Sequence, residues 1–268
     1  MPYASVKGQR IYYEVGGDGE AMVLVHGALS DADMMEAPAT GLASGFRVIR
    51  FDRRGHGRTG GAPGPVSLAD EAADLAAFLD WFGIAGTHLL AHDEGAEVAL
   101  ELALAAPERV LSLGLLAPTL EGFAWSDGTR QASAALAAAM ASPEKAVREI
   151  LVPSQAFDAA RERDGLEERL LRMFLRSAPA AARFVRAPRP GGEPQAARLS
   201  AVTARTAIFV GDRDETDRLL CAEAIADGIA GAELVTFPGL GRFLHMEEPR
   251  SVMTRMTDFF LPEPRVES

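Results

Sequence analysis

The residues best suited to chemistry lie in one short stretch, where an aspartate stands between an apolar strand and a helix. The stretch reads LLAHDEGA over residues 89–96, and small residues, Ala91 and Gly95, flank Asp93 at a distance of two. Small residues at these positions let a strand and a helix approach closely around a strained turn that thrusts the central side chain outward. We therefore expect Asp93 to present a carboxylate above the edge of a sheet.

Four further segments accompany this turn. They read VLVHGA (23–28), FDRRGHGRT (51–59), VGDRD (210–214) and FPGLGRFLHMEEP (237–249). Together with the turn, they resemble the α/β-hydrolase superfamily over nearly the whole chain. The resemblance implies that Asp93 occupies the nucleophile position, that Asp214 is the acid of the catalytic triad, and that residues 237–249 surround the triad histidine.

Two positions depart from the pattern of this superfamily. The nucleophile position holds Asp93 where serine is commonest, and Arg242 stands where the triad histidine normally follows Gly241. A guanidinium stays protonated, so Arg242 cannot act as a general base, and we expect it to form an ion pair with Asp214. His245 lies three residues further on, where family members often carry a second, non-catalytic histidine.

An aspartate in this turn is familiar in the superfamily's dehalogenases and epoxide hydrolases, in which a carboxylate attacks carbon and forms an ester. Water activated by a histidine must then cleave the ester. The supporting residues look absent, since Glu94 stands where haloalkane dehalogenases have tryptophan and fluoroacetate dehalogenases have arginine. Epoxide hydrolases use tyrosines of the cap, whereas the tyrosines here are all N-terminal: Tyr3, Tyr12 and Tyr13.

The main expectation is therefore a non-hydrolytic enzyme of specialised metabolism. Burial under an apolar lid, close to Glu94, would raise the pKa of Asp93 and suit it to work as a general base or acid. Backbone N–H groups of Ala28 and Glu94 would form an oxyanion hole for a developing enolate. The predicted reaction is a cyclisation, elimination or carbon–carbon bond formation on an apolar, carbonyl-bearing small molecule, with no cofactor and no metal.

Two alternatives stay open. One is an Asp-nucleophile hydrolase of the dehalogenase or epoxide-hydrolase type, in which His245 activates the water. The other is a catalytically silent protein that binds a small ligand. Gibberellin receptors resemble this second case, because they keep the fold and have lost the triad histidine.

The residues around the turn have expected places as well. The substrate pocket is expected to be lined by His26, Leu29, Phe123 and Trp125. His26 is also expected to hold its loop through hydrogen bonds. His92 is expected to be a packed core residue that points away from Asp93, and Glu97 a charge favoured at the N-terminus of a helix.

The elements that must position these residues alternate between short apolar strands and helices. An N-terminal strand or hairpin is predicted at 5–16, and strands are predicted at 21–27, 47–52, 87–93, 111–118, 206–212 and 233–239. Helices are predicted from Ser67 to about Trp81, over 94–110 and over roughly 248–260. This alternation predicts an α/β fold with a mostly parallel, doubly wound sheet.

Residues 119–202 interrupt this rhythm and read as several helices with no strand. We therefore expect a core formed by 1–118 and 203–268, with an all-helical cap over 119–202. Pro188, Pro190 and Pro194 mark the loop back to the sheet. Such a cap would cover the carboxyl ends of the strands, where sheets of this kind bind ligands.

Composition excludes several classes of protein. The 268 residues include 27 Lys and Arg against 38 Asp and Glu, a formal charge of −11 that would repel nucleic acid. One cysteine, Cys221, excludes an internal disulfide and a multi-thiolate metal site. No segment reads as a secretion signal or a membrane span. We expect a cytoplasmic protein whose partner is a small apolar molecule; the sequence does not indicate its oligomeric state.

Overall fold

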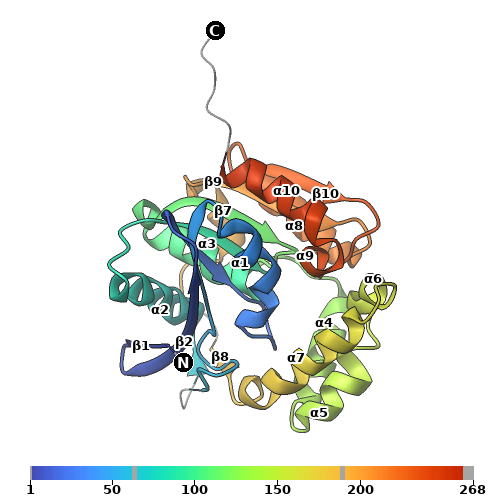
Figure 1. The fold of residues 1–268 in the computed structure, drawn as a ribbon. Helices are drawn as coiled ribbons and strands as arrows, with labels where there is room; N and C mark the ends of the chain where they lie inside the picture. The colour runs from blue at the N-terminus through green and yellow to red at the C-terminus, as the bar shows by residue number, and fades with distance from the viewer. Residues whose placement is uncertain (1, 62–64, 188–190, 262–268) are drawn as a thin grey trace.

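The centre of the protein is an open sheet of eight strands, shown in the computed structural model of Figure 1, which describes residues 2–61, 65–187 and 191–261. The strands are β1 (Tyr3–Val6), β2 (Gln9–Gly16), β3 (Glu20–Val25), β4 (Phe46–Phe51), β6 (Thr87–His92), β7 (Val110–Leu116), β9 (Arg205–Gly211) and β10 (Glu233–Phe237). They lie in the order β1-β2-β4-β3-β6-β7-β9-β10. The pairs β1–β2 and β2–β4 are antiparallel and the others are parallel, so the predicted mostly parallel sheet is confirmed.

Helices cover both faces of this sheet. They are α1 (Glu36–Leu42), α2 (Leu68–Trp81), α3 (Glu94–Ala105), α8 (Thr216–Gly228), α9 (Leu244–Glu247) and α10 (Pro249–Phe260). Side chains of α2, α3 and α8 share one apolar cluster with the sheet, and those of α1, α9 and α10 belong to the other. Neighbouring strand residues alternate between the clusters, as Leu89 and Leu90 of β6 do, because successive side chains of a strand point to opposite faces.

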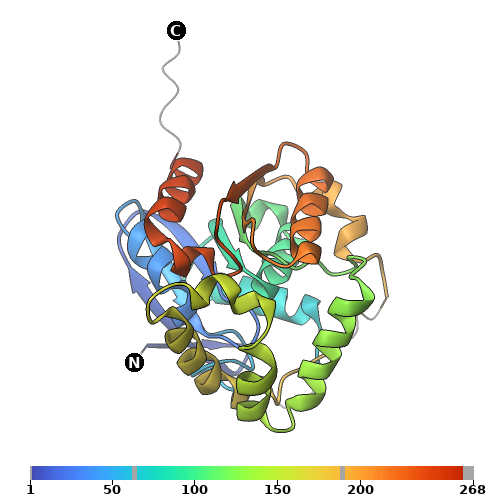
Figure 2. The same cartoon turned by 90° about the vertical axis from the view of Figure 1, so that its right-hand side faces the viewer.

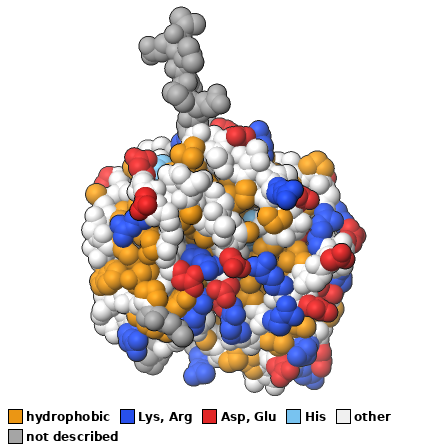
Figure 3. All heavy atoms as spheres, in the orientation of Figure 1, with side chains coloured by type: hydrophobic (Ala, Val, Ile, Leu, Met, Phe, Trp, Pro, Cys, Tyr) orange, Lys and Arg blue, Asp and Glu red, His pale blue; other side chains and the backbone are white. Residues whose placement is uncertain are grey.

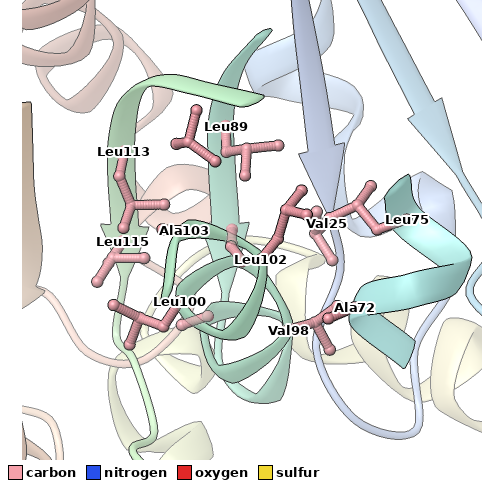
Figure 4. Packing of buried hydrophobic residues seen from close by; sticks show 14 of the residues in the cluster. Val25, Ala72, Leu75, Leu89, Val98, Leu100, Leu102, Ala103, Leu113 and Leu115 are labelled. Atoms are coloured by element: carbon pink, nitrogen blue, oxygen red, sulfur yellow. The ribbon is translucent and has the colours of Figure 1, made fainter. Parts of the chain in front are cut away.

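The helix that carries the site packs tightly on the sheet. Figure 4 shows Val98 and Leu102 of α3 among Leu89, Leu113 and Val25 of the strands. Burying a side chain of this size contributes about 1.5–3 kcal/mol, so this face of α3 is fixed with respect to β6. A rigid α3 in turn fixes the turn that joins the two elements.

A mainly helical insertion separates β7 from β9 (Figure 2). It contains α4 (Asp127–Ala139), α5 (Pro143–Ala146), α6 (Asp158–Arg161) and α7 (Leu166–Ala181). The expectation of no strand in this stretch is wrong, because β8 (Val185–Arg186) pairs in parallel with β5 (Pro65–Val66). The domain boundaries at 118 and 203 stay a prediction, and Pro188 and Pro190 lie outside the described residues.

A charged cluster ties the insertion to the core. Arg176 of α7 donates to both carboxylate oxygens of Asp31, and its Nη2 lies 2.7 Å from Asp33. Ser177 adds a hydrogen bond of 3.0 Å to Asp31, which is fully buried. Figure 3 shows basic and acidic side chains interleaved across this face of the molecule. These contacts hold α7 against the loop that follows β3.

The helices of the described ranges contain no segment long and apolar enough to cross a membrane.

Candidate active site

Asp93 stands in the turn between β6 and α3 with a strained backbone. Its φ is 52° and its ψ is −124°, values that a residue with a side chain rarely adopts. Such a residue costs on the order of 1–3 kcal/mol and persists only where neighbours hold it in place. The carbonyl of Asp93 accepts from the N–H groups of Ala96 and Thr119, and its own N–H donates to Leu116. The strained turn predicted from the sequence is therefore present.

Gly95 permits the close approach of strand and helix at this turn. A Cβ on Gly95 would lie 2.5 Å from the carbonyl oxygen of His26 and 2.6 Å from that of Val25. Both contacts are with backbone of the central sheet, which cannot move aside as a side chain can. The absence of a side chain at Gly95 is thus a requirement of the packing.

Replacing Gly95 by alanine is expected to lower the free energy of unfolding by about 1–3 kcal/mol, the range for overpacking in a core. Urea unfolding measures the change. Gly128→Ala in α4 is the matched control, because the nearest atom to its Cβ would be Ser126 Oγ at 3.8 Å. A Gly95→Ala protein as stable as wild type would contradict this account of the turn.

The carboxylate of Asp93 is held by two donors. Arg218 Nη1 lies 2.5 Å from Oδ1, and the N–H of Ala28 donates to Oδ2 at 3.2 Å. Burial raises the pKa of Asp93, but the positive charge of Arg218, with smaller contributions from His92 and Arg242, holds it well below its ordinary value. The expectation of a raised pKa is therefore wrong, because Arg218 was not foreseen as a counter-ion. Asp93 is ionised at neutral pH.

Arg242 lies beside a second pair of carboxylates. Its Nε is 3.4 Å from Asp214 Oδ1, and its Nη2 is 2.5 Å from Glu215 Oε2. The expected ion pair with Asp214 is present, and it is shared with Glu215. Within the described part of the chain, the two guanidiniums of Arg218 and Arg242 thus face three carboxylates at this site.

His245, the base of the alternative hydrolase mechanism, does not reach the carboxylate of Asp93, and His26 is engaged by its own loop. His245 is fully buried, and its Nε2 donates to the carbonyl of Met34 at 3.1 Å; no hydrogen bond joins it to Asp93 or Asp214 among the residues described. His26 donates from Nδ1 to Gly27 at 2.8 Å and accepts at Nε2 from the N–H of Arg53 at 2.9 Å. His26 therefore holds its loop, but its place in the pocket lining was wrong, because it is fully buried with both nitrogens engaged.

The other predicted pocket residues are only partly buried. The rings of Phe123 and Trp125 lie 4.8 Å apart, and the guanidinium carbon of Arg218 lies 5.6 Å from the Trp125 ring. The structure therefore places Trp125 beside Arg218, the counter-ion of Asp93. Leu29 has a φ of 53° and packs against the cluster that includes the insertion.

A charged network that the sequence did not reveal lies beside the turn. Arg186 of β8 donates to Glu97 and Glu71 and lies 3.7 Å from Glu94. Glu97 lies in the first turn of α3, as expected of a helix N-terminal charge, but it is also only 8% exposed and paired with Arg186. Its burial, with the nearby charge of Glu94, raises its pKa from 4.5 to about 6 against the opposing effect of Arg186.

Glu97 is expected to make stability depend on pH. Since the folded protein binds this proton more tightly than the unfolded chain, the stabilisation is full below pH 4.5 and is lost as the pH rises through about 6. The loss amounts to about 2 kcal/mol at most. Urea unfolding between these pH values should show this slope in wild type and a flatter one in Glu97→Gln. Equal slopes in the two proteins would contradict the assignment.

The sequence held one weak signal for Arg218. It lies four residues after Asp214, at the start of α8, so a helical turn can carry it toward the same edge of the sheet. Glu94 lies within 4 Å of Arg53 and Arg186, and the use of its N–H in an oxyanion hole stays a prediction. In the described ranges, no three His, Cys, Asp or Glu side chains group so as to hold a metal ion.

Comparison with known proteins extends this description. The putative carbamate hydrolase RutD of Variovorax paradoxus is 30% identical over 268 residues, which cover 93% of this chain and 95% of that protein. RutD of Azorhizobium caulinodans is 38% identical over 128 residues, 48% of this chain and 47% of that one, so this alignment spans about half of each protein. A fluoroacetate dehalogenase of a Burkholderia species is 34% identical over 110 residues, 37% of this chain and 35% of the relative. An esterase structure from Thermogutta terrifontis superposes with a TM-score of 0.83 at 23% identity, over 97% of both chains, which shows a shared fold.

These findings correct the main functional expectation. The relatives described above are named as carbamate hydrolases, a dehalogenase and an esterase, so the prediction of a non-hydrolytic cyclisation, elimination or carbon–carbon bond formation was wrong. Nothing among them supports a place in specialised metabolism. A model of the alpha/beta hydrolase family matches residues 22–255, and the chain therefore belongs to that family of enzymes.

Proposed function

We propose that this protein hydrolyses small, neutral, apolar molecules that carry a halide on a saturated carbon, through an ester formed on Asp93. The observation that carries the proposal is the carboxylate at the turn, which Arg218 keeps ionised and the N–H of Ala28 orients. An ionised carboxylate with a depressed pKa is a weak base, but it is present as a nucleophile over the whole physiological range.

The contacts of Asp93 suggest different roles for its two carboxylate oxygens. Oδ2, which accepts from Ala28, would become the carbonyl oxygen of the ester and later the oxyanion during its cleavage. Oδ1 would attack the substrate carbon, and the bond from that carbon to the halogen would break as the halide leaves. Arg218 would place positive charge beside the attacking oxygen and the space that receives the halide.

The residues around Asp93 favour a halide over an epoxide as substrate. A halide leaves as a stable anion, whereas the alkoxide of an opened epoxide needs a proton. The tyrosines that could supply one are Tyr3, Tyr12 and Tyr13, all near the N-terminus and none in the insertion. The fluoroacetate dehalogenase among the relatives is consistent with halide chemistry, although its alignment covers only 37% of this chain.

The charge of the site favours a neutral substrate. Asp93, Asp214 and Glu215 together carry one more charge than Arg218 and Arg242 can balance. A further carboxylate on the substrate would meet this negative surplus at short range, where screening by salt is weak. We therefore expect a neutral haloalkane to be a better substrate than a haloacetate.

The test is a panel of four compounds: bromobutane, bromoacetate, epoxyhexane and nitrophenyl butyrate. Bromide release and alcohol formation from bromobutane are expected to exceed turnover of the other three. Mass spectrometry of the quenched protein should show one butyl group on the peptide that contains Asp93. Ester hydrolysis alone, with no butyl adduct at any time, would overturn the proposal.

A further inference from the structure

The proposed ester at Asp93 needs a base that activates water, and the usual position for it holds Arg242. A guanidinium cannot accept a proton at ordinary pH. Among the described residues, the buried side chains without a hydrogen-bond partner at one atom include two imidazoles, His92 and His245, each at Nδ1. These two nitrogens are the candidates for the base, and both rings lie near the end of β6.

The protonation of His92 follows from the hydrogen bond that its Nε2 makes. Its Nε2 lies 3.2 Å from the carbonyl oxygen of Arg242, and a carbonyl can only accept. Nε2 therefore carries the hydrogen in the neutral ring, and Nδ1 carries a free lone pair. The backbone of Arg242 thus orients the ring in the way that a triad carboxylate orients its histidine, although the Arg242 side chain cannot do this work.

His92 Nδ1 and the carboxylate of Asp93 both lie close to Gly27. A Cβ built on Gly27 would lie 2.9 Å from Asp93 Oδ2 and 3.0 Å from His92 Nδ1. Asp93 Oδ2 and His92 Nδ1 therefore both lie against Gly27, in the loop that also supplies the N–H of Ala28. His92 is a packed core residue, as expected, since it is 2% exposed and contacts His245 and Phe243. Its Nδ1 nevertheless lies near the same glycine as Asp93 Oδ2, so the ring does not point away from Asp93 at this atom.

We propose that His92 is the general base that cleaves the Asp93 ester; the inference rests on the proposed function. His92 Nδ1 takes a proton from water, and the water oxygen bonds to Cγ of Asp93. The bond from Cγ to the substrate oxygen then breaks, and that oxygen takes the proton from His92 and leaves as the alcohol. The second water proton goes to solvent as the carboxylate forms again beside Arg218.

The surroundings keep His92 in the form that can accept a proton. Burial lowers the pKa of His92, and Arg242 and Arg218 lower it further, while Asp93 acts in the opposite direction. The ring packs against His245 at 5.0 Å and Phe243 at 6.1 Å, which restricts its rotation. The oxyanion that develops on Asp93 as water attacks would offset the charge on the imidazolium.

His92→Gln tests the assignment, His245→Gln tests the other candidate imidazole, and His88→Gln, at the start of β6, is the matched control. Each protein is mixed with bromobutane, and released bromide and the butyl adduct are followed in time. In His92→Gln we expect one equivalent of bromide at the wild-type rate, a lasting butyl adduct on Asp93, and ester cleavage slowed by about 10²–10⁴-fold. In His88→Gln we expect turnover close to that of wild type, and in His245→Gln we expect the adduct to be cleaved rather than trapped.

The outcomes separate this inference from the proposed function. Normal turnover in His92→Gln, or a trapped adduct only in His245→Gln, overturns the role of His92 and leaves the ester mechanism intact. No bromide and no adduct in wild type overturns both. If His92→Gln does not fold, nitrogen-15 spectra of the wild-type histidines decide: the inference requires an unprotonated Nδ1 in His92, and a hydrogen on Nδ1 contradicts it.

Discussion

Replacing Asp93 by asparagine is expected to lower the rate of product formation by at least about 10⁴-fold, which is the typical effect of removing a catalytic nucleophile. An amide has no negative charge with which to displace a halide, although its oxygen can still accept from Arg218 or Ala28. Bromide release from bromobutane measures the rate. The adduct at this position should be absent at all times.

The matched control for Asp93→Asn is Glu223→Gln. Glu223 is exposed on α8, the helix that also carries Arg218, and its change removes one negative charge from the same region. We expect wild-type rates and stability in this control, whereas Asp93→Asn is expected to be less stable because it leaves the charge of Arg218 without the Asp93 carboxylate. Rates are therefore compared at a temperature at which both variants are folded. An Asp93→Asn enzyme that keeps a tenth or more of the wild-type rate would show that the carboxylate is not the nucleophile.

Replacing Arg218 by methionine is expected to have the largest effect on stability. Arg218 and Asp93 form a buried ion pair at 2.5 Å, and removing one partner of such a pair typically costs about 3–5 kcal/mol. Methionine keeps most of the apolar length of the side chain, so the decrease in the free energy of unfolding reflects the loss of the positive charge. Urea unfolding at neutral pH gives the change, and a loss below about 1 kcal/mol would contradict the pairing.

The same variant should change the dependence on pH. In wild type the pKa of Asp93 is depressed, so the ionised carboxylate stabilises the folded protein fully above about pH 3.9, the ordinary pKa of an aspartate. This stabilisation is lost only as the pH falls further, through the depressed pKa. Without Arg218, the pKa of Asp93 would rise, because burial would be opposed only by the smaller effects of His92 and Arg242. The rate of adduct formation should then fall with decreasing pH within the measurable range, and Arg218→Lys should restore the wild-type profile in part.

Much of the scaffold could be predicted from local patterns. Apolar runs of four to eight residues report burial on both faces of a parallel strand, and the strands found at 87–92 and 205–211 lie within one residue of the predicted starts. Ser67 starts α2 with the capping box that its spacing to Asp70 implies. The strained turn at Asp93 was predictable because two small residues at fixed spacing are required there.

The site itself was only partly predictable, because its electrostatics depend on contacts between distant segments. Arg218 lies 125 residues from Asp93 in the sequence, and no local pattern pairs them. The pKa of Asp93 was therefore expected to change in the wrong direction. The tautomer of His92 likewise depends on a carbonyl 150 residues away, so a strand residue that looked like core became a candidate base.

The central claim is that Asp93 forms an ester with the substrate, and a single turnover in water labelled with oxygen-18 tests it most directly. With enzyme in excess over bromobutane, the account predicts that the label enters the carboxylate of Asp93 and that the butanol carries unlabelled oxygen from the protein. Labelled butanol from the first turnover, with no label in the peptide that contains Asp93, would mean that water attacks the substrate directly and would contradict the account.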